Sequence, residues 1–336
     1  MQAAVFEGPG HLMLKEVAPP VLGRADHVRL QVEAVGICGT DVHITSDPPG
    51  YAATPGVILG HEFVGRVAEV GGDVTHVVVG DRVVVNPNLS CGVCSACASL
   101  RPNLCSNIRA VGIDEDGAFA AQWVGASRLC YRISGAVTPA AGAFGEMLAD
   151  VVNGINRAGI RPGQSAAVIG LGPIGHLFAQ VLSHSGADPV FLIDRAPYRL
   201  DAARRLGWKN VVDASISVEM EELHRRTNGG PDLIVDAVGS VLGTAIDLVG
   251  RGGTVLVFGV NTRARTEFPQ SLITTKELKV IGTWLAPGSF PDAVRLLESG
   301  ALDLEPLVSH RLPLAAVHEG LELLRTQQAL KVLIQP

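Results

Sequence analysis

A glycine-rich segment between a predicted strand and a predicted helix constrains the fold of this chain more than any other feature. The apolar run 165–170 leads into the sequence GLGPIG at 170–175, and the residues after it have helical spacing. A second short apolar run, 190–194, ends in Asp194. Together these segments form the fingerprint of a dinucleotide-binding unit, whose glycines allow a tight turn and the close approach of a pyrophosphate to a helix N-terminus. The residues expected to contact the dinucleotide are Gly170, Gly172, Pro173, Ile174, Gly175 and Asp194.

The acid at the end of the second predicted strand indicates which dinucleotide binds. Asp194 would accept hydrogen bonds from the adenine-side ribose hydroxyls and repel a 2′-phosphate, so NAD is favoured over NADP. Arg195 follows it directly and works against this preference, because an arginine can hold a phosphate.

Four more apolar runs follow the dinucleotide motif and complete a predicted sheet. They lie at residues 210–212, 232–236, 253–258 and 279–281, with helical stretches between several of them. Six strands with helical connections predict a complete doubly wound sheet in an α/β protein.

Length and composition limit the classes of protein to consider. The chain has 336 residues, more than one hydrophobic core usually serves, so we expect two domains. A hydrophobic content of 47% with 18% charged residues excludes intrinsic disorder. A net charge of −6 without a basic block argues against nucleic acid or an anionic membrane as a partner. The N-terminal residues lack the pattern of a secretory signal, and a cytoplasmic location is expected.

Four of the six cysteines form a cluster with the spacing C-x2-C-x2-C-x7-C, at Cys91, Cys94, Cys97 and Cys105. In a cytosolic chain such clustering indicates a metal rather than disulfides. Zinc can be bound by four thiolates with no coordination position left open, which predicts a structural site. An iron–sulfur cluster is the alternative, because such clusters are bound by cysteines with similar spacings. Cys130 stands alone and is expected to pack as a small apolar side chain.

A second set of ligand-type residues lies upstream in two short segments. GICGTDVH supplies Cys38, Thr40, Asp41 and His43, and VILGHEF supplies His61 and Glu62. Cysteine, histidine and glutamate are the donor types of an open catalytic zinc site, which has three protein ligands and a position for water or substrate. Residues this far apart bind one ion only if the fold brings them together.

The segments on either side of the dinucleotide-binding part predict a mostly β domain. Residues 27–34 alternate between apolar and polar, which is typical of a half-buried antiparallel strand. Short β-like runs continue to about residue 132. Helical patterns at 291–300 and 314–326 and a final apolar run at 330–334 are expected to rejoin this domain.

In this order, the three features resemble the zinc-dependent medium-chain dehydrogenase/reductases, the alcohol and polyol dehydrogenase family. The likeness covers essentially the whole chain and is carried by GICGTDVH, GHEFVG, GDRVVV, the four-cysteine segment, GLGPIG with Asp194, and KVLI. It implies a GroES-like catalytic domain at 1–145 and 285–336, with a structural zinc lobe at about 86–110. It also implies a Rossmann NAD-binding domain at 146–284 and a homo-oligomer, a dimer or a tetramer, of which the tetramer is favoured.

The resemblance further implies the ligands of a catalytic zinc. Cys38 and His61 match direct ligands, and Glu62 matches an acid that binds the metal or lies just outside its ligands. Glu146 occupies the position of a further ligand, which is a glutamate in polyol-type members, although Met147 replaces the usual proline. Asp41 matches the acid that orients the zinc-bound imidazole.

Four more residues acquire roles through the resemblance. Thr40 and His43 match the two ends of a proton relay that passes through the nicotinamide ribose. Arg199 matches a basic residue near the adenosine ribose, and Lys331 matches one that reaches the pyrophosphate.

The implied reaction is hydride transfer from a secondary alcohol to NAD, giving a ketone, with one catalytic and one structural zinc per chain. The expected substrate is a polyol, cyclitol or aminocyclitol, and the expected partners are this small molecule and further copies of the chain. A threonine-dehydrogenase-like or simple alcohol dehydrogenase is the alternative enzyme. From another class, a nucleotide-binding module without turnover is an alternative, against which the complete set Cys38, Thr40, His43, His61 and Glu62 argues.

Overall fold

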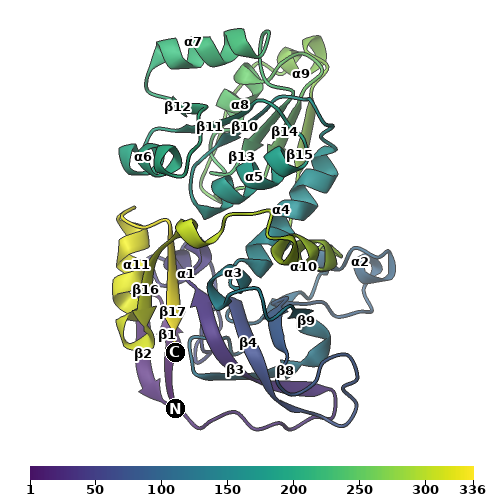
Figure 1. The fold of residues 1–336 in the computed structure, drawn as a ribbon, viewed down its shortest axis with the longest axis vertical. Coiled ribbons are helices and arrows are strands. Elements are labelled where there is room, and N and C mark those ends of the chain that lie inside the picture. The colour runs from purple at the N-terminus through teal and green to yellow at the C-terminus, as the bar shows by residue number, and fades with distance from the viewer. The chain divides into compact units, whose positions relative to one another are not determined.

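Two segments far apart in the sequence fold together in the computed structural model, which describes residues 1–336. Met1–Ala149 and Ala286–Pro336 form the first unit, and Asp150–Leu285 form the second. Figure 1 shows the chain, with its N-terminal segment in purple and its C-terminal segment in yellow within the same unit. None of the helices has the length and apolar character needed to cross a membrane.

The second unit is built around a parallel sheet of six strands. In spatial order these are β12 (Val211–Asp213), β11 (Val190–Asp194), β10 (Ala166–Ile169), β13 (Leu233–Asp236), β14 (Thr254–Val257) and β15 (Lys279–Gly282). Counted within the unit this order is 3-2-1-4-5-6, the doubly wound arrangement that the sequence predicts. Every residue of β10, β11 and β13 is buried, because helices cover both faces of a parallel sheet and leave no strand face to water.

Helices alternate with the strands of the second unit along the chain, as expected for a doubly wound sheet. They are the end of α4 (Gly145–Ala158), then α5 (Pro173–His184), α6 (Pro197–Arg205), α7 (Ser217–Arg226), α8 (Leu242–Leu248) and α9 (Ser271–Thr275). The apolar face predicted for α5 is confirmed, since Leu177, Val181 and Leu182 are buried.

The first unit contains a mostly antiparallel sheet. Its order is β16 (Val308–Pro313), β17 (Lys331–Gln335), β3 (His27–Gly36), β4 (Glu62–Val70), β5 (Arg82–Val85) and β9 (Cys130–Ile133), and β8 (Gln122–Ala126) also pairs with β3. The alternation predicted in β3 is confirmed, with Val28, Leu30, Val32 and Ala34 buried. The predicted return of the C-terminal strand is also confirmed, because Ile334 of β17 pairs with Val35 of β3.

Shorter elements complete the first unit. They are the hairpin of β1 (Gln2–Gly8) and β2 (His11–Glu16), the pair β6 (Asn88–Leu89) and β7 (Arg109–Ala110), and the helices α1 (Gly39–Ile44), α2 (Ser95–Ala98), α3 (Pro139–Gly142), α10 (Phe290–Ser299) and α11 (Val317–Arg325). Helices α10 and α11 lie where the sequence predicts helical patterns. Residue Cys130 is buried, as expected of an unpaired cysteine that packs as an apolar side chain.

Candidate active site

Helix α1 fixes the first group of candidate site residues. Cys38 is its N-cap, and the Cys38 N–H donates to Asp41 Oδ2 at 2.8 Å. This capping bond turns Asp41 inward, where its side chain is 0% exposed. Thr40 and His43 lie three positions apart and therefore share another face of the helix; Thr40 is half-buried and His43 exposed.

The fold brings the second group to the first. Glu62 is the first residue of β4, His61 directly precedes it, and both are buried. One ligand atom each from Cys38, His61 and Glu62 lies within 4.8 Å of the other two. His61 Nδ1 is 3.7 Å from Asp41 Oδ1, beyond hydrogen-bond distance but on the side where that carboxylate can orient the ring.

A buried lysine holds Glu62 from the other side. Lys331, on β17, directs its ammonium to Glu62 Oε2, to the Ile37 carbonyl oxygen at 3.0 Å and to Met147 Sδ at 3.7 Å. Both side chains of this ion pair are only 1% exposed. The close approach requires Gly36, since a Cβ there would lie 2.6 Å from both Glu62 Oε2 and Lys331 Cε.

The structure gives Lys331 a partner in Glu62, and the pyrophosphate contact that the resemblance implies stays a prediction. The ammonium is enclosed by three partners in the first unit, because a buried carboxylate needs a cation beside it. Sequence reasoning missed this ion pair. The one local signal is the position of Lys331 directly before three apolar residues, 332–334, of the same strand.

The polar atoms of this cluster fit a bound metal ion. Asp41 Oδ1, His61 Nδ1 and Glu62 Oε1 are buried without a hydrogen-bond partner. Burial raises the pKa of the Cys38 thiol well above its usual value, and the charges of Glu62, Asp41 and Glu146 raise it further. Burial opposes a charged His61, but the carboxylates of Asp41, Glu62 and Glu146 together raise its pKa. A cation among a thiol, an imidazole and a carboxylate would offset this excess negative charge, and zinc prefers these donors.

Glu146 lies near this cluster without belonging to its three-donor group. It is in the first turn of α4 and is half-buried. Its charge influences the pKa of both Cys38 and His61. The position is therefore compatible with a contact to the same ion.

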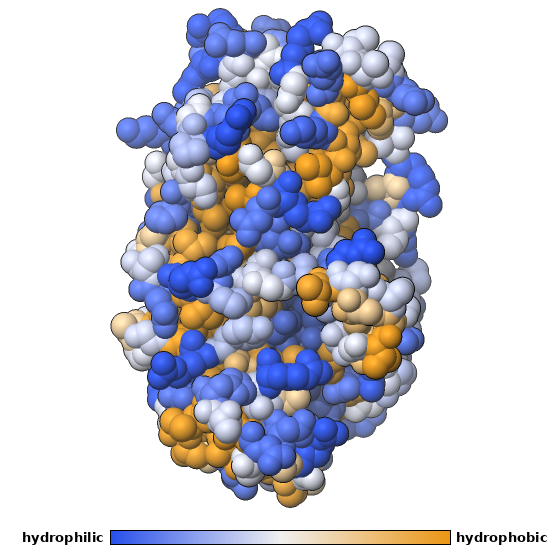
Figure 2. Space-filling view, turned by 90° about the vertical axis from the view of Figure 1, so that its right-hand side faces the viewer, coloured by the Kyte–Doolittle hydropathy of each residue, from blue (hydrophilic) through white to orange (hydrophobic).

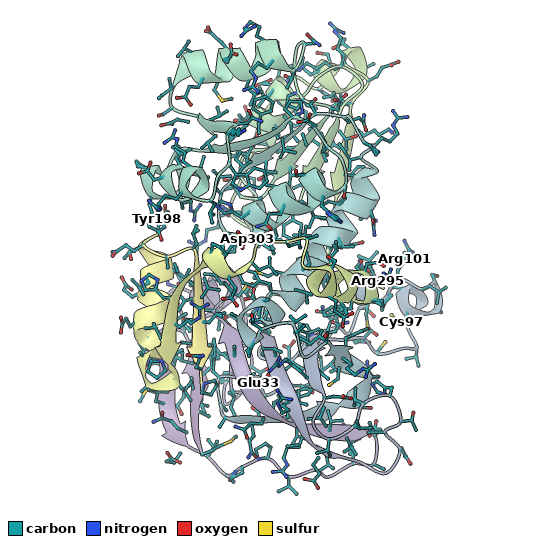
Figure 3. All side chains as sticks on the ribbon, in the orientation of Figure 1. Glu33, Cys97, Arg101, Tyr198, Arg295 and Asp303 are labelled. Carbon is teal, nitrogen blue, oxygen red and sulfur yellow. The ribbon has the colours of Figure 1, made fainter.

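The four clustered cysteines converge on one point in the first unit. The Sγ atoms of Cys91, Cys94, Cys97 and Cys105 all lie within 4.8 Å of one another. The backbone N–H groups of Cys97 and Ser106 lower the pKa of Cys94 to about 5, which favours its thiolate. Figure 3 labels Cys97 and Arg101 beside α2 on this lobe. The segment includes the helix α2 and the strand pair β6–β7. Four sulfur donors at this spacing fit a structural zinc ion.

The glycine motif of the second unit joins β10 to α5. Gly170 has φ +101°, which favours glycine, and a Cβ on Gly175 would collide with the Gly170 carbonyl oxygen. A Cβ on Gly172 would meet nothing within 4 Å, so open space lies before the first helical residues, Pro173 and Ile174. This open helix N-terminus fits a pyrophosphate.

Asp194 lies at the carboxyl end of β11, next to the glycine motif. Its Oδ2 accepts the Leu171 N–H at 2.8 Å, and its Oδ1 accepts the N–H groups of Arg195 at 2.7 Å and Ala196 at 2.9 Å. Arg199 on α6 places Nη1 3.6 Å from Asp194 Oδ2. The structure thus brings Asp194 and Arg199 together, and their contact with the adenosine ribose stays a prediction.

A buried histidine lies beside this pair and was missed by sequence reasoning. His176, in the first turns of α5, is 0% exposed, and neither ring nitrogen has a hydrogen-bond partner. Burial lowers its pKa to about 4, and the charge of Arg199 lowers it further against the opposing effect of Asp194. His176 is therefore neutral near pH 7.

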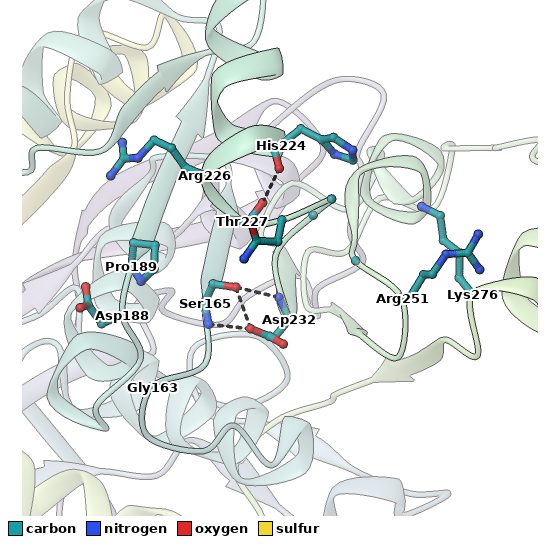
Figure 4. Close-up of a pocket in the computed structure, with 14 residues that line it drawn as sticks. Gly163, Ser165, Asp188, Pro189, His224, Arg226, Thr227, Asp232, Arg251 and Lys276 are labelled. Atoms are coloured by element: carbon teal, nitrogen blue, oxygen red, sulfur yellow. Dashed lines mark hydrogen bonds between the residues drawn. The ribbon is translucent and has the colours of Figure 1, made fainter.

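A cavity of about 690 Å³ lies at the opposite, amino-terminal ends of the same strands (Figure 4). Its polar groups are largely used within the protein: Asp232 Oδ2 accepts the N–H of Ser165 at 2.8 Å and its O–H at 2.7 Å. Lys276 donates to three carbonyl oxygens, those of Ile246, Asp247 and Val249. Since ligands of doubly wound sheets bind at the carboxyl ends of the strands, this cavity is separate from the candidate cofactor site.

Comparison with known proteins identifies the family of the chain. The family model of the alcohol dehydrogenase GroES-like domain matches residues 24–135, and that of the zinc-binding dehydrogenases matches residues 173–299. The D-altritol 5-dehydrogenase of Agrobacterium fabrum is 38% identical over 94% of this chain and 93% of its own length. The sorbitol dehydrogenase of Bombyx mori is 31% identical over 99% of this chain and 97% of its own length.

A solved structure shows the same fold. A zinc-binding dehydrogenase from Sinorhizobium meliloti, crystallised with NADP, superposes with a TM-score of 0.94 at 32% identity and covers 100% of this chain and 99% of its own. The chain therefore belongs to the zinc-dependent medium-chain dehydrogenase/reductases, a family of NAD(P)-dependent oxidoreductases that act on alcohols.

Proposed function

We propose that this enzyme oxidises a secondary hydroxyl of a polyol, cyclitol or aminocyclitol to a ketone, with NAD as the hydride acceptor. The observation that carries the proposal is the convergence of Cys38, His61 and Glu62 beside Thr40. The similarity to polyol dehydrogenases supports the substrate class. In this proposal the first unit is the catalytic domain and the second binds NAD.

The proposed metal sites divide the donors into two groups. Cys38, His61 and Glu62 would hold the catalytic zinc, with Glu146 as a further or water-mediated ligand. The four clustered cysteines would hold a structural zinc. When bound, zinc supplies a Lewis acid that lowers the pKa of an alcohol hydroxyl, and NAD supplies the hydride acceptor.

The residues of α1 would move the proton. The Thr40 hydroxyl can accept the proton of a substrate hydroxyl and donate its own onward. His43, on the same helix face and exposed, would release the proton to solvent. Asp41, held by the Cys38 N–H, would keep the His61 ring oriented.

A substrate panel tests the proposal directly. NADH formation would be followed by absorbance with zinc-loaded protein against polyols, cyclitols, aminocyclitols, L-threonine and simple alcohols. We expect the strongest signal from a hydroxyl-rich secondary alcohol. A preference for L-threonine or for a simple alcohol would contradict the substrate class, and absence of NADH binding would contradict the dehydrogenase proposal.

Replacing Thr40 by alanine should lower kcat by about 100-fold or more, because the variant lacks the hydroxyl that passes on the proton. Steady-state kinetics with the best substrate of the panel would measure this effect. The control is Thr40→Ser, which keeps a hydroxyl and should retain most of the activity. An unchanged kcat in Thr40→Ala would remove Thr40 from the mechanism.

The metal content should be about two zinc ions per chain, one for each donor group. Elemental analysis should give about one ion for Cys38→Ser and about one for Cys97→Ser, since each variant loses one donor group. Cys130→Ala is the matched control and should keep about two. A Cys97→Ser protein with undiminished zinc would exclude the four-cysteine site.

We also propose that the enzyme is a cytoplasmic homotetramer. A reducing compartment keeps four clustered thiols available for metal, which supports the location. The edge strand β15 supports assembly: Val280 on it is 40% exposed and Trp284 after it is 38% exposed. Figure 2 shows apolar side chains on the surface of the molecule. Size-exclusion chromatography with light scattering tests the tetramer.

A further inference from the structure

We infer that the free edge of strand β8 is a second interface between copies of this chain, at which β8 pairs antiparallel with β8 of another copy. The inference rests on the proposed homotetramer and names the residues of a contact that the proposal leaves unassigned. It is carried by the free backbone groups of β8, by the groove beside them and by the charges on the rim of that groove.

Strand β8 has a hydrogen-bonded neighbour on one side only. Its residues, Gln122–Ala126, pair with β3 alone. The Val32 N–H donates to the Ala121 carbonyl oxygen at 2.9 Å, so the bonded positions of this antiparallel ladder are the odd-numbered residues of β8. The N–H and C=O groups of the alternate residues therefore point away from β3 and have no hydrogen-bond partner in the structure; these residues are Gln122, Val124 and Ala126.

The free groups of β8 match those of a second β8 about a two-fold axis at Val124. In an antiparallel pair centred there, Val124 faces Val124 of the other copy, and Gln122 faces Ala126 of the other copy. All three outward positions then fall in hydrogen-bonded pairs, so each free N–H of one strand meets a free C=O of the other. A two-fold interface needs such self-complementarity, because it brings the same patch of two copies together.

A groove of about 510 Å³ lies against β8, and residues 123–126 of the strand line it. Leu89, Val111 and Leu129 add apolar lining from neighbouring segments. Val111 and Leu129 are each only 2% exposed, so they belong to the floor of the groove. The groove therefore offers a second strand both space and apolar contacts beside the free backbone groups.

The rim of the groove carries charges of both signs. Arg24 and Asp26 form an ion pair, with Nε 2.9 Å from Oδ1. Glu115 is paired with Arg109 at 3.1 Å, whereas Arg128 is exposed and has no ion-pair partner. A rim of mixed sign finds complementary charges on the same rim of a second copy, but it gives no net attraction to a strongly acidic or basic partner. The charges therefore favour a second copy as the occupant.

The symmetry of a tetramer supplies the need for a second interface. Four copies related by closed two-fold symmetry require at least two different self-complementary patches on each copy. The edge strand β15 offers one such patch in the second unit, and β8 lies in the first unit. The β8 edge is therefore the contact that joins two dimers into a tetramer.

Molar mass tests the inference, measured by size-exclusion chromatography with light scattering on the zinc-loaded full chain. Val124→Pro removes the central outward N–H and leaves the ladder to β3 intact, because that N–H faces away from β3. Val124→Lys keeps the backbone and places two ammonium groups against each other across the axis. At the same chain concentration, both variants should have half the molar mass of the wild type, two chains instead of four. Val124→Thr is the control and should keep the wild-type mass.

An unchanged mass in the folded variants, with folding checked by circular dichroism, would overturn the β8 interface. Val124→Lys decides the outcome alone if Val124→Pro does not fold. A wild type of one or two chains would also overturn the inference and leave the groove to a partner other than this chain. NADH binding by that wild type would keep the proposed dehydrogenase function intact, whereas a wild type that binds no NADH would overturn the function itself.

Discussion

Replacing Lys331 by methionine should lower the free energy of unfolding by about 3 to 5 kcal/mol, the usual cost of removing one partner of a buried ion pair. Methionine has a similar length and fills much of the same space, so the cavity contribution is small. In the metal-free protein the loss arises because Glu62 stays buried at 1% exposure without the Lys331 ammonium, and the Ile37 carbonyl oxygen loses its donor.

Urea unfolding followed by circular dichroism would measure the change. The control is Lys15→Met, which breaks an ion pair with Glu7 at the surface and should cost less than about 1 kcal/mol. The double variant Lys331→Met with Glu62→Gln should be more stable than Lys331→Met alone, because it removes the unpaired charge. Equal losses for Lys331→Met and Lys15→Met would show that the buried pair does not stabilise the fold.

Acidification should destabilise the protein through His176, and His176→Leu should remove that part of the effect. The pKa of His176 is lowered to about 4 in the folded chain, against 6.5 for an unperturbed histidine. As the pH falls below 6.5, the His176 imidazole becomes protonated in the unfolded chain but stays neutral in the folded chain. The stability that this group contributes above pH 6.5 is therefore lost progressively towards pH 4. From this one group the loss is about 2 kcal/mol at pH 5 and at most about 3 kcal/mol.

Urea unfolding of wild type and His176→Leu at pH 7.5 and pH 5 would test this expectation. The loss on acidification should be smaller in the variant by about 2 kcal/mol. His184→Gln is a suitable control, because His184 lies on the same helix but is exposed, and it should retain the wild-type pH dependence. The same loss in wild type and His176→Leu would exclude His176 as the cause.

The strands could be predicted from the sequence wherever the local pattern of apolar residues shows which side chains are buried. Strand β11 is an apolar run, 190–193, that ends in Asp194, and β3 alternates with period two, so both can be predicted without a structure. The donor types of the catalytic metal site could also be predicted, because Cys38, His61 and Glu62 are distinctive residues in short motifs.

The contacts that the sequence could not reveal are long-range ones. Lys331 pairs with Glu62, which lies 269 positions away in the sequence, and the residues of β17 do not identify this partner. His176 lies on the buried side of α5, although histidine alone suggests a polar surface position. In both cases tertiary packing overrides the local preference of the residue.

The position of β17 has a consequence for how the protein is made. β17 is the last strand of the chain, and it lies between β16 and β3 in the sheet of the first unit. The second unit, in contrast, is one continuous stretch, Asp150–Leu285. During translation the second unit has all its strands outside the ribosome before the first unit does. The sheet of the first unit can therefore be completed only after β17 has been synthesised. Until then Glu62 lacks the lysine that neutralises it.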